Sequence, residues 1–342
     1  IMDEPTSALG PEEVTVLGEI VHRLKSQGLA VIFITHRLEE VFRVADRIVV
    51  LRDGRRVGAM PIDQANTEAI ISLMVGRALE GQFRTDAARR GGETVLEVRG
   101  LTRRGVIHDV SFSLRRGEIL GIAGLVGAGR TETVRVIFGA DPLDAGEIYV
   151  EGRRVPITSP EVAMQAGLAL VPENRQRQGL VLIQSVERNI ALPSLDRLSR
   201  HRFVDRRRMR QLGQTYVDRL RIRTPSLEQR VLFLSGGNQQ KVVLAKWLAT
   251  GPKVLILDEP TRGIDVGAKA EVHSIMRDLA ERGIGIIMIS SEMPEILAMS
   301  DRILVMCEGR VAGILDRAEA TQERIMAYAS GAALSQADGN GR

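Results

Sequence analysis

The chain has 342 residues, of which 26% are charged and 44% hydrophobic, with a formal net charge of +4. These values are typical of a globular protein. No apolar run approaches the roughly 18 to 20 residues that a membrane-spanning helix needs, which excludes a membrane channel. A single cysteine, Cys307, excludes a disulfide framework and suits a reducing compartment. We interpret it as a small side chain in or near a strand.

The first predicted elements are a strand, a helix and a second strand. The chain opens at the end of a predicted buried strand, with Asp3 and Glu4 at its carboxyl end. A helical pattern closed by Gly28 follows, and the apolar run "LAVIFIT" predicts a strand that delivers His36. Such a unit predicts a parallel crossover. His36 would then lie beside Asp3 and Glu4, at the sheet edge where α/β proteins bind ligands.

The sequence repeats itself without a gap. Asp3 in "IMDEPTSALG" matches Asp258 in "LILDEPTRGI", 255 residues later, and Gly76 matches Gly331 at the same offset. A repeat of this length marks a duplicated structural unit. We therefore predict one complete copy preceded by the last third of another, and we expect about 160 residues of the first copy to be absent from this sequence.

The repeat also sets the predicted domain boundaries. Residues 1–76 end the first copy, 77–94 form a polar linker, and 95–331 make up the second, complete copy. The remaining residues, 332–342, are too poor in apolar side chains to pack, so we expect a disordered tail.

Arginines cluster between Arg200 and Arg210. Such a cluster could bind nucleic acid. However, the segment also carries apolar residues at helical spacing, and aromatic residues make up only 3% of the chain, which leaves little for base stacking. We interpret the cluster as a solvated helix face and expect no nucleic-acid partner.

A glycine-rich turn between an apolar strand and a helix predicts a phosphate-binding loop. In "EILGIAGLVGAGRTETVRVIFG", Gly124, Gly127 and Gly129 would let backbone N–H groups point into one concavity at a helix N-terminus. Thr131 occupies the hydroxyl position that ligates Mg²⁺. The lysine expected beside it is Arg130, which keeps the charge but is not a compact point charge. For this motif alone, an ordinary tight turn is the alternative.

Two carboxylates follow a second buried strand. "VLILDEP" ends in Asp258 and Glu259. The first suits Mg²⁺ coordination, and the second suits polarisation of an attacking water. Alone, the pair could be a solvated strand end, but it follows the glycine loop and is repeated at Asp3 and Glu4.

A third motif, "LSGGNQQK", starts at Leu234 and places Ser235, Gly236 and Gly237 at the start of a helix, where their N–H groups would face an anion. A generic loop-to-helix junction is the alternative. Together with "GLVGAGRTE", "VPENRQRQGL", "LDEPTRGIDVG" and "ISSEMPE", this octet resembles the second cassette of tandem ATP-binding subunits in ABC importers of ribose, galactose and xylose type. "MDEPTSAL", "FITHRLEEVF" and "MVGR" resemble the end of the first cassette.

The resemblance implies an α/β fold of the P-loop ABC type, with a mixed sheet, an antiparallel β layer and a helical subdomain, which binds ATP and Mg²⁺. It also implies two cassettes facing head to tail, with each ATP between the phosphate loop of one and the "LSGG" helix of the other. The implied ATP-binding residues are Gly124, Gly127, Ala128, Gly129, Arg130, Thr131, Glu173, Ser235, Gly236, Gly237, Gln239 and Ser291. The implied Mg²⁺ ligands are Asp3, Thr131 and Asp258, and the implied catalytic residues are Glu4, His36 and Glu259.

The resemblance also implies that the two sites differ. His36 matches the family's histidine that contacts the γ-phosphate, whereas the second cassette has Ser291 there. Glu173 replaces the family's glutamine that senses Mg²⁺ and water. With Arg130, these changes mark the second site as the poorer catalyst. We expect the competent site to combine Glu4 and His36 with the "LSGG" helix and an upstream phosphate loop, and this chain alone to be a weak or inactive ATPase.

In function, the resemblance implies an ATPase at the cytoplasmic face of the cell membrane. It would energise sugar import through separate permease subunits, which work with a periplasmic or extracellular sugar-binding protein. Two alternatives stay open. One is a soluble tandem ABC ATPase acting on ribosomes or DNA, and the other is a nucleotide-binding module without hydrolysis.

Overall fold

The computed structural model describes residues 1–3, 5–6, 11–35, 38–52, 55–66, 70, 73, 92–200 and 203–331. Glu4, His36 and the predicted tail lie outside these residues, as does all of the predicted linker except 92–94. The chain divides into two compact units, the first mainly from Ile1–Phe83 and the second mainly from the residues after them.

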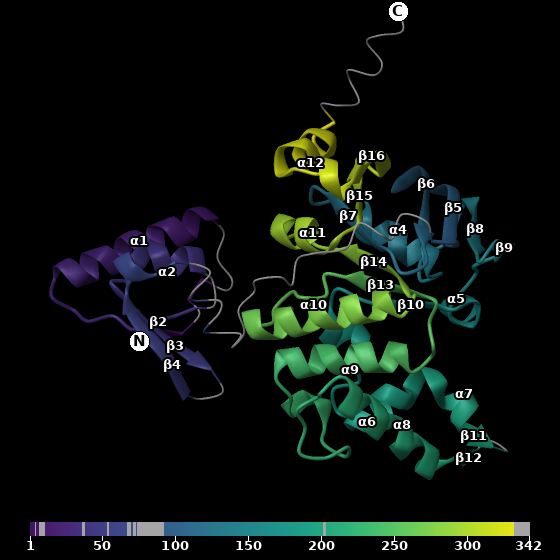
Figure 1. Cartoon of the computed structure of the whole chain (residues 1–342), viewed down its shortest axis with the longest axis horizontal. Coiled ribbons are helices and arrows are strands. Elements are labelled where there is room, and N and C mark those ends of the chain that lie inside the picture. Colours follow the sequence, from purple (N-terminus) through teal and green to yellow (C-terminus); the bar gives the residue numbers. More distant parts are fainter. Residues whose placement is uncertain are drawn as a thin grey trace, which may run out of the picture. The chain divides into compact units, whose positions relative to one another are not determined.

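The first unit contains two small two-stranded sheets and the helices α1 and α2 (Figure 1). The predicted crossover is parallel, because Met2 pairs with Phe33 and Asp3 with Ile34. A second, antiparallel pair follows, and its inward side chains form a small core with Ile70. The elements are β1 (Met2–Asp3), α1 (Pro11–Ser26), β2 (Phe33–Ile34), α2 (Leu38–Val44), β3 (Arg47–Arg52), β4 (Arg55–Pro61) and the short 3₁₀ helix Ile62–Gln64.

The strand predicted from "LAVIFIT" is shorter than expected. Among the described residues of this run, Phe33 and Ile34 are in a ladder, where they pair with Met2 and Asp3. Leu29 and Ile32 are more than half exposed. The apolar run therefore indicated the strand correctly.

The second unit is built on a mixed sheet, as predicted, and its six strands run in the order β10-β13-β14-β7-β15-β16. All neighbouring pairs are parallel except β15 and β16. The central strands are buried throughout, which explains their continuous apolar runs. The strands are β7 (Ile119–Gly124), β10 (Leu168–Val171), β13 (Val254–Asp258), β14 (Gly285–Ile289), β15 (Arg302–Cys307) and β16 (Arg310–Asp316). Cys307 thus lies in a strand, as predicted.

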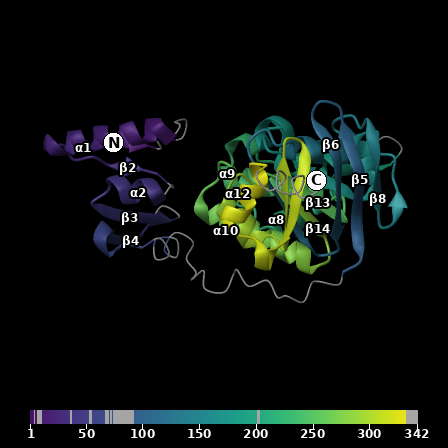
Figure 2. The ribbon, with the colours of Figure 1, turned by 90° about the horizontal axis from the view of Figure 1, so that it is seen from above.

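A four-stranded antiparallel sheet forms the predicted β layer, in the order β6-β5-β8-β9. Figure 2 shows β5, β6 and β8 together at one side of the second unit. Side chains from this sheet, from the mixed sheet and from the helix after β7 share one large core. The strands are β5 (Thr94–Arg103), β6 (Ile107–Arg115), β8 (Ala145–Val150) and β9 (Arg153–Arg154).

In the helical subdomain, the helices and the hairpin other than α9 lie on the side of α9 that faces away from the mixed sheet (Figure 1). The subdomain contains α6 (Val186–Ala191), α7 (Leu195–Leu198), α8 (Arg206–Arg219), α9 (Gly236–Leu248) and the hairpin of β11 (Ser199–Arg200) and β12 (Phe203–Val204). The remaining α-helices among the described residues are α4 (Arg130–Ile137), α5 (Pro160–Ala166), α10 (Val266–Glu281), α11 (Met293–Met299) and α12 (Gln322–Ala329). A π-helical turn spans Arg175–Gly179, and short 3₁₀ helices span Leu192–Ser194, Val231–Phe233 and Arg317–Glu319. Within the arginine cluster, Arg206, Arg207 and Arg208 are exposed on α8, as predicted for a solvated helix face.

The repeat in the sequence recurs in the secondary structure. The pair Met2↔Phe33 in the first unit corresponds to Leu257↔Met288 in the second, at the same offset of 255 residues. Both antiparallel pairs that follow also carry an irregularity at equivalent positions, Val50/Leu51 and Val305/Met306. A bulge at the same place requires the same local twist, so the two segments share backbone detail as well as sequence. Among the described residues, no helix combines the length and apolarity that crossing a bilayer requires.

Candidate functional site

The glycine loop joins the centre of the mixed sheet to α4. Gly124, Gly127 and Gly129 have φ angles of 152°, 82° and 90°, which side chains rarely allow. A Cβ on Gly124 would lie 2.6 Å from the carbonyl oxygen of Met306, so this glycine is required by packing. A Cβ on Gly127 would meet nothing within 4 Å. The loop therefore leaves open space at a helix N-terminus, which fits an anionic phosphate.

Two oxygen-bearing side chains meet beside this loop. Thr131 Oγ1, in the first turn of α4, donates a hydrogen bond of 3.3 Å to Asp258 Oδ1 at the end of β13. Burial raises the pKa of Asp258 to about 6; the Thr131 bond opposes this rise, and the neighbouring Glu259 charge adds to it. Hydroxyl and carboxylate oxygens are ligands that Mg²⁺ accepts, so these two residues fit the ion that the loop chemistry implies.

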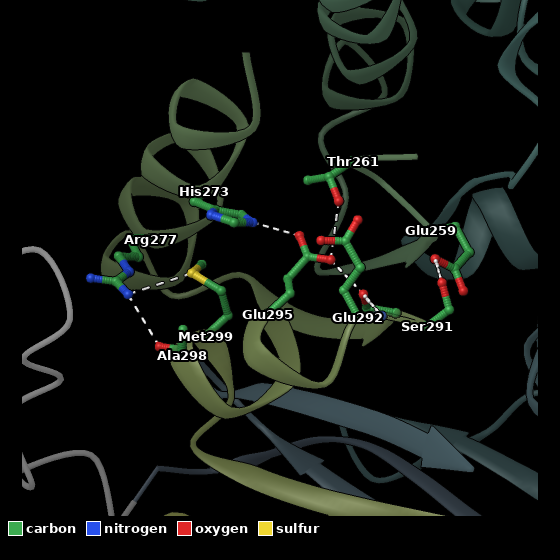
Figure 3. A network of polar contacts seen from close by, with 10 residues as sticks. Glu259, Thr261, His273, Arg277, Ser291, Glu292, Glu295, Ala298 and Met299 are labelled. Carbon is green, nitrogen blue, oxygen red and sulfur yellow. Dashed lines mark hydrogen bonds and ion pairs between the residues drawn. The ribbon is translucent and has the colours of Figure 1, made fainter. Parts of the chain in front are cut away.

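Arg130, Glu259 and Ser291 lie around the same strand ends. Arg130 Nη1 donates to the backbone oxygen of Ser290, at 3.0 Å, just beyond β14. Ser291 Oγ donates to Glu259 Oε2 at 3.0 Å (Figure 3). Glu259 itself has a φ of 49°, a left-handed conformation that is uncommon for a residue with a side chain. The side chains of Arg130 and Glu259 are therefore both hydrogen-bonded to residues 290–291, directly after β14.

Glu173 lies in a second network that sequence reasoning did not foresee. Its carboxylate forms an ion pair with Arg262. Two residues later, Arg175 donates to the backbone oxygens of Arg262 and Gly263, at 2.7 and 2.9 Å. A Cβ on Gly236 would lie 2.9 Å from Arg175 Nη2. The segment after β10 is thus fastened to the loop after "LDEP" and packs against the start of α9.

The start of α9 carries the "LSGG" motif. Ser235 precedes the helix and accepts a hydrogen bond of 2.9 Å from Asn238 Nδ2. Gln239 is only 3% exposed; its amide accepts from Gln176 and donates to the backbone of Val231, both at 3.2 Å. The Gln239 side chain therefore faces the interior of the protein. A nucleotide would reach it only after its hydrogen bonds to Gln176 and Val231 break.

In the first unit, Asp3 is exposed at the end of β1. Its predicted neighbours Glu4 and His36 lie outside the described residues. Two buried glutamates that sequence reasoning missed are described, Glu40 on α2 and Glu295 on α11. They stand at the repeat's offset from each other, and this equivalence is the signal that could have found them.

A family model described as ABC transporter matches residues 107–262. The chain is 48% identical over 333 residues to a ribose import ATP-binding protein of Bacillus subtilis, covering 97% of this chain and 67% of that protein. It is 55% identical over 334 residues to one from Rubrobacter xylanophilus, covering 96% and 66%. The chain therefore belongs to the ABC transporter family of ATP-binding proteins. It spans about two thirds of the length of the curated relatives it matches.

Solved structures agree on the fold. An ATP-binding cassette of an ABC transporter in its ADP conformation matches with a TM-score of 0.58 at 19% identity, covering 71% of this chain and 97% of that chain. A nucleotide-free cassette matches with a TM-score of 0.59 at 19% identity, covering 69% and 95%. The predicted ABC-type α/β fold is thus confirmed for one copy.

The raised pKa of Asp258 predicts how stability depends on pH. Its ordinary value is 3.8, so as the pH rises the unfolded state loses this proton before the folded state does. In metal-free buffer, the Asp258 contribution should lower the free energy of unfolding between about pH 4 and pH 6, by up to about 3 kcal/mol. Asp258→Asn has no such proton. Urea unfolding at a series of pH values should show that the free energy of unfolding of the variant rises relative to that of wild type between about pH 4 and pH 6. The same pH dependence of the free energy of unfolding in both proteins would contradict the prediction.

Proposed function

We propose that this chain is part of the ATP-binding subunit of an ABC transporter that imports a sugar. The observation that carries the proposal is the open glycine loop beside the Thr131 and Asp258 pair, on a fold shared with ATP-binding cassettes. The names of the relatives, which are ribose import ATP-binding proteins, support a monosaccharide as the cargo. The subunit would act at the cytoplasmic face of the membrane, with permease subunits and an external sugar-binding protein.

The first unit is, in this proposal, the last third of a first cassette in a tandem protein. Its support is the repeat, which preserves element order, strand register and the position of the bulge. The greater length of the relatives agrees with it. In the tandem protein, the site with Asp3, Glu4 and His36 would be completed by Ser235 to Gly237 and by a phosphate loop upstream of this sequence.

The roles of the second cassette's residues follow from their positions. Backbone N–H groups of the glycine loop would bind the phosphates, while Thr131 and Asp258 would hold Mg²⁺, which neutralises phosphate charge when bound. Glu259 would orient the attacking water. Its carboxylate is held by the Ser291 hydroxyl rather than by an imidazole, so no cationic side chain at that position stabilises the charge that develops in transfer.

A specific observation favours nucleotide binding with little hydrolysis at this second site. The Arg130 guanidinium, which stands at the position of the phosphate-loop lysine, donates to the Ser290 backbone. A planar fork held there cannot follow the γ-phosphate as a lysine ammonium would. The site with Glu4 and His36 is then the proposed catalyst, and Glu173 and Ser291 would tune binding at the second site.

The glycine loop provides a test of nucleotide binding with a matched control. Gly127 has space for a side chain, and aspartate and asparagine both tolerate its left-handed backbone better than most residues do. Gly127→Asp should weaken affinity for a fluorescent ATP analogue at least about tenfold more than Gly127→Asn, because only the carboxylate repels phosphate. The difference should shrink with added salt. Equal affinities for the two variants would remove the phosphate-loop assignment.

The asymmetry of the two sites gives a second prediction. In the full-length protein, Glu4→Gln should reduce ATP turnover about a hundredfold or more, whereas Glu259→Gln should leave a substantial fraction. Ser235→Arg should behave like Glu4→Gln, because it blocks the same composite site. This chain alone should release little phosphate at saturating Mg·ATP. Equal losses from the two glutamine variants, or brisk turnover by this chain, would refute the asymmetry.

The proposed permease contact lies between Glu173 and Ser235, a segment without catalytic motifs. Within it, Ile183, Leu232 and Phe233 are 69%, 50% and 67% exposed. The backbone N–H of Leu232 donates to the oxygen of Leu182 at 3.0 Å, so the two stretches lie side by side. Exposed apolar side chains gathered in this way are typical of a protein interface.

Replacing Phe233 by aspartate should therefore weaken the complex with the permease at least about tenfold, since it puts a charge into an apolar contact. Phe203→Asp is the matched control, because Phe203 is also exposed, at 80%, but lies in the β11–β12 hairpin. Affinity can be measured by titrating each variant onto detergent-solubilised permease. Binding that is lost with Phe203→Asp and kept with Phe233→Asp would move the contact to the hairpin.

A further inference from the structure

A buried glutamate on α11 gathers polar groups from three elements. Glu295 is 6% exposed; its Oε2 accepts hydrogen bonds from Thr261 at 3.0 Å and Ser290 at 2.5 Å. Its Oε1 lies 2.5 Å from His273 Nε2, on α10 (Figure 3). Burial alone would raise the pKa of Glu295, but His273, Ser290 and Thr261 together bring it below its ordinary value. The carboxylate is therefore held as an ionised acceptor inside the protein.

The first unit repeats this arrangement with its own residues. Glu40 on α2 is 7% exposed, and its Oε2 accepts from Thr6 at 2.8 Å and from Thr35 at 2.9 Å. Each of these residues matches its counterpart in the second unit at the offset of 255. One difference is that His273 corresponds to Gly18. The two hydroxyl contacts on one carboxylate oxygen are thus the common element.

In each unit, one hydroxyl belongs to a residue that follows the proposed water-orienting glutamate, and the other belongs to the residue just before His36 or Ser291. Thr261 is two residues after Glu259, and Ser290 directly precedes Ser291 and also accepts Arg130 on its backbone oxygen. In the first unit, Thr6 stands two residues after Glu4, and Thr35 directly precedes His36. Each carboxylate therefore ties the segment after one strand to the end of the neighbouring strand.

We propose that Glu40 and Glu295 are positioning residues, each of which fixes the distance between the water-orienting glutamate and the facing strand end in its own ATP site. The inference rests on the proposed function. Bonds from a hydroxyl to an ionised carboxylate are short and strong. Breaking these bonds would leave a buried carboxylate without hydrogen-bond partners, which is costly. The two segments that carry the hydroxyls are therefore held at a fixed distance from each other.

The positioning role predicts a specific kinetic signature. The hydroxyls that bond to Glu40 and Glu295 belong to the segments after neighbouring strands and not to a glycine loop, so nucleotide affinity should persist when one of these contacts is lost. Orientation of the attacking water should suffer instead, because a displacement of about 1 Å at a reacting group can cost about a hundredfold in rate. A merely structural role would lower stability, affinity and turnover together.

Substitutions at Thr35 test the positioning role by removing or keeping a single hydroxyl group. In the full-length protein, Thr35→Val removes the hydroxyl and keeps the shape, whereas Thr35→Ser keeps the hydroxyl, as Ser290 does at the equivalent position. We expect Thr35→Val to lower kcat at least about tenfold while the Kd for ATP changes less than about twofold, and Thr35→Ser to restore kcat. Thr215→Val is the control, because it removes an exposed threonine hydrogen bond on α8.

A normal kcat in Thr35→Val, or a failure of Thr35→Ser to restore it, would overturn the proposal. A parallel fall of kcat, affinity and unfolding temperature would also overturn it, in favour of a structural role.

Ser290→Ala in the present chain gives a second test that does not depend on ATP turnover. Amide hydrogen exchange of the peptide covering 257–262 should then speed up at least about threefold, with other core peptides unchanged.

The exchange experiment also separates two kinds of failure. If wild type neither binds nor hydrolyses ATP, the proposed function fails, and faster exchange in Ser290→Ala would still support the coupling of the two segments. If wild type turns over ATP and exchange at 257–262 is unaffected in Ser290→Ala, the positioning role fails while the proposed function stands.

Discussion

The parallel pairing of β13, β14 and β7 is the constraint on which the candidate site depends. Asp258 pairs with Ile289, and Ile289 pairs with Ile122, so the three strands reach the same edge in register. Parallel strands end on the same side, and the groups that follow them must meet there. The glycine loop, the carboxylate pair and the 290–291 segment come together for this reason, although they lie far apart in the sequence.

At that edge, the chemistry is decided by which partner holds each charge. Arg130 is engaged by a backbone oxygen, Glu259 by a serine hydroxyl, and Glu173 by Arg262. Each of these charged groups is therefore bonded to another group of the protein. In the proposed function, the glycine loop would still bind phosphate, while Arg130 and Glu259, which would act on a reacting phosphate, already have partners in the protein. We therefore propose that binding and hydrolysis are separable at this site.

The duplicated segments show which parts of this arrangement are scaffold. Strand register, the bulge and the hydroxyl contacts of the buried glutamate are the same in both units. The difference of His36 against Ser291 stands next to these contacts, and the difference of Thr35 against Ser290 within them keeps the hydroxyl. A fixed frame of buried contacts lets the exposed position change without disturbing the strands, because most of the folding free energy comes from the buried side chains.

The sequence by itself determined the features that rest on local rules. Glycine spacing and apolar runs located the glycine-rich turn before α4 and the ends of β7 and β13, and the repeat predicted the matching elements of the first unit. Tertiary structure decided the rest. That Gln239 faces inward, that Arg175 packs against Gly236, and that Glu295 joins Thr261 to Ser290 were not predicted. The physical reason is that the role of a polar side chain is set by partners distant in the chain, which only the folded sheet brings within hydrogen-bonding distance.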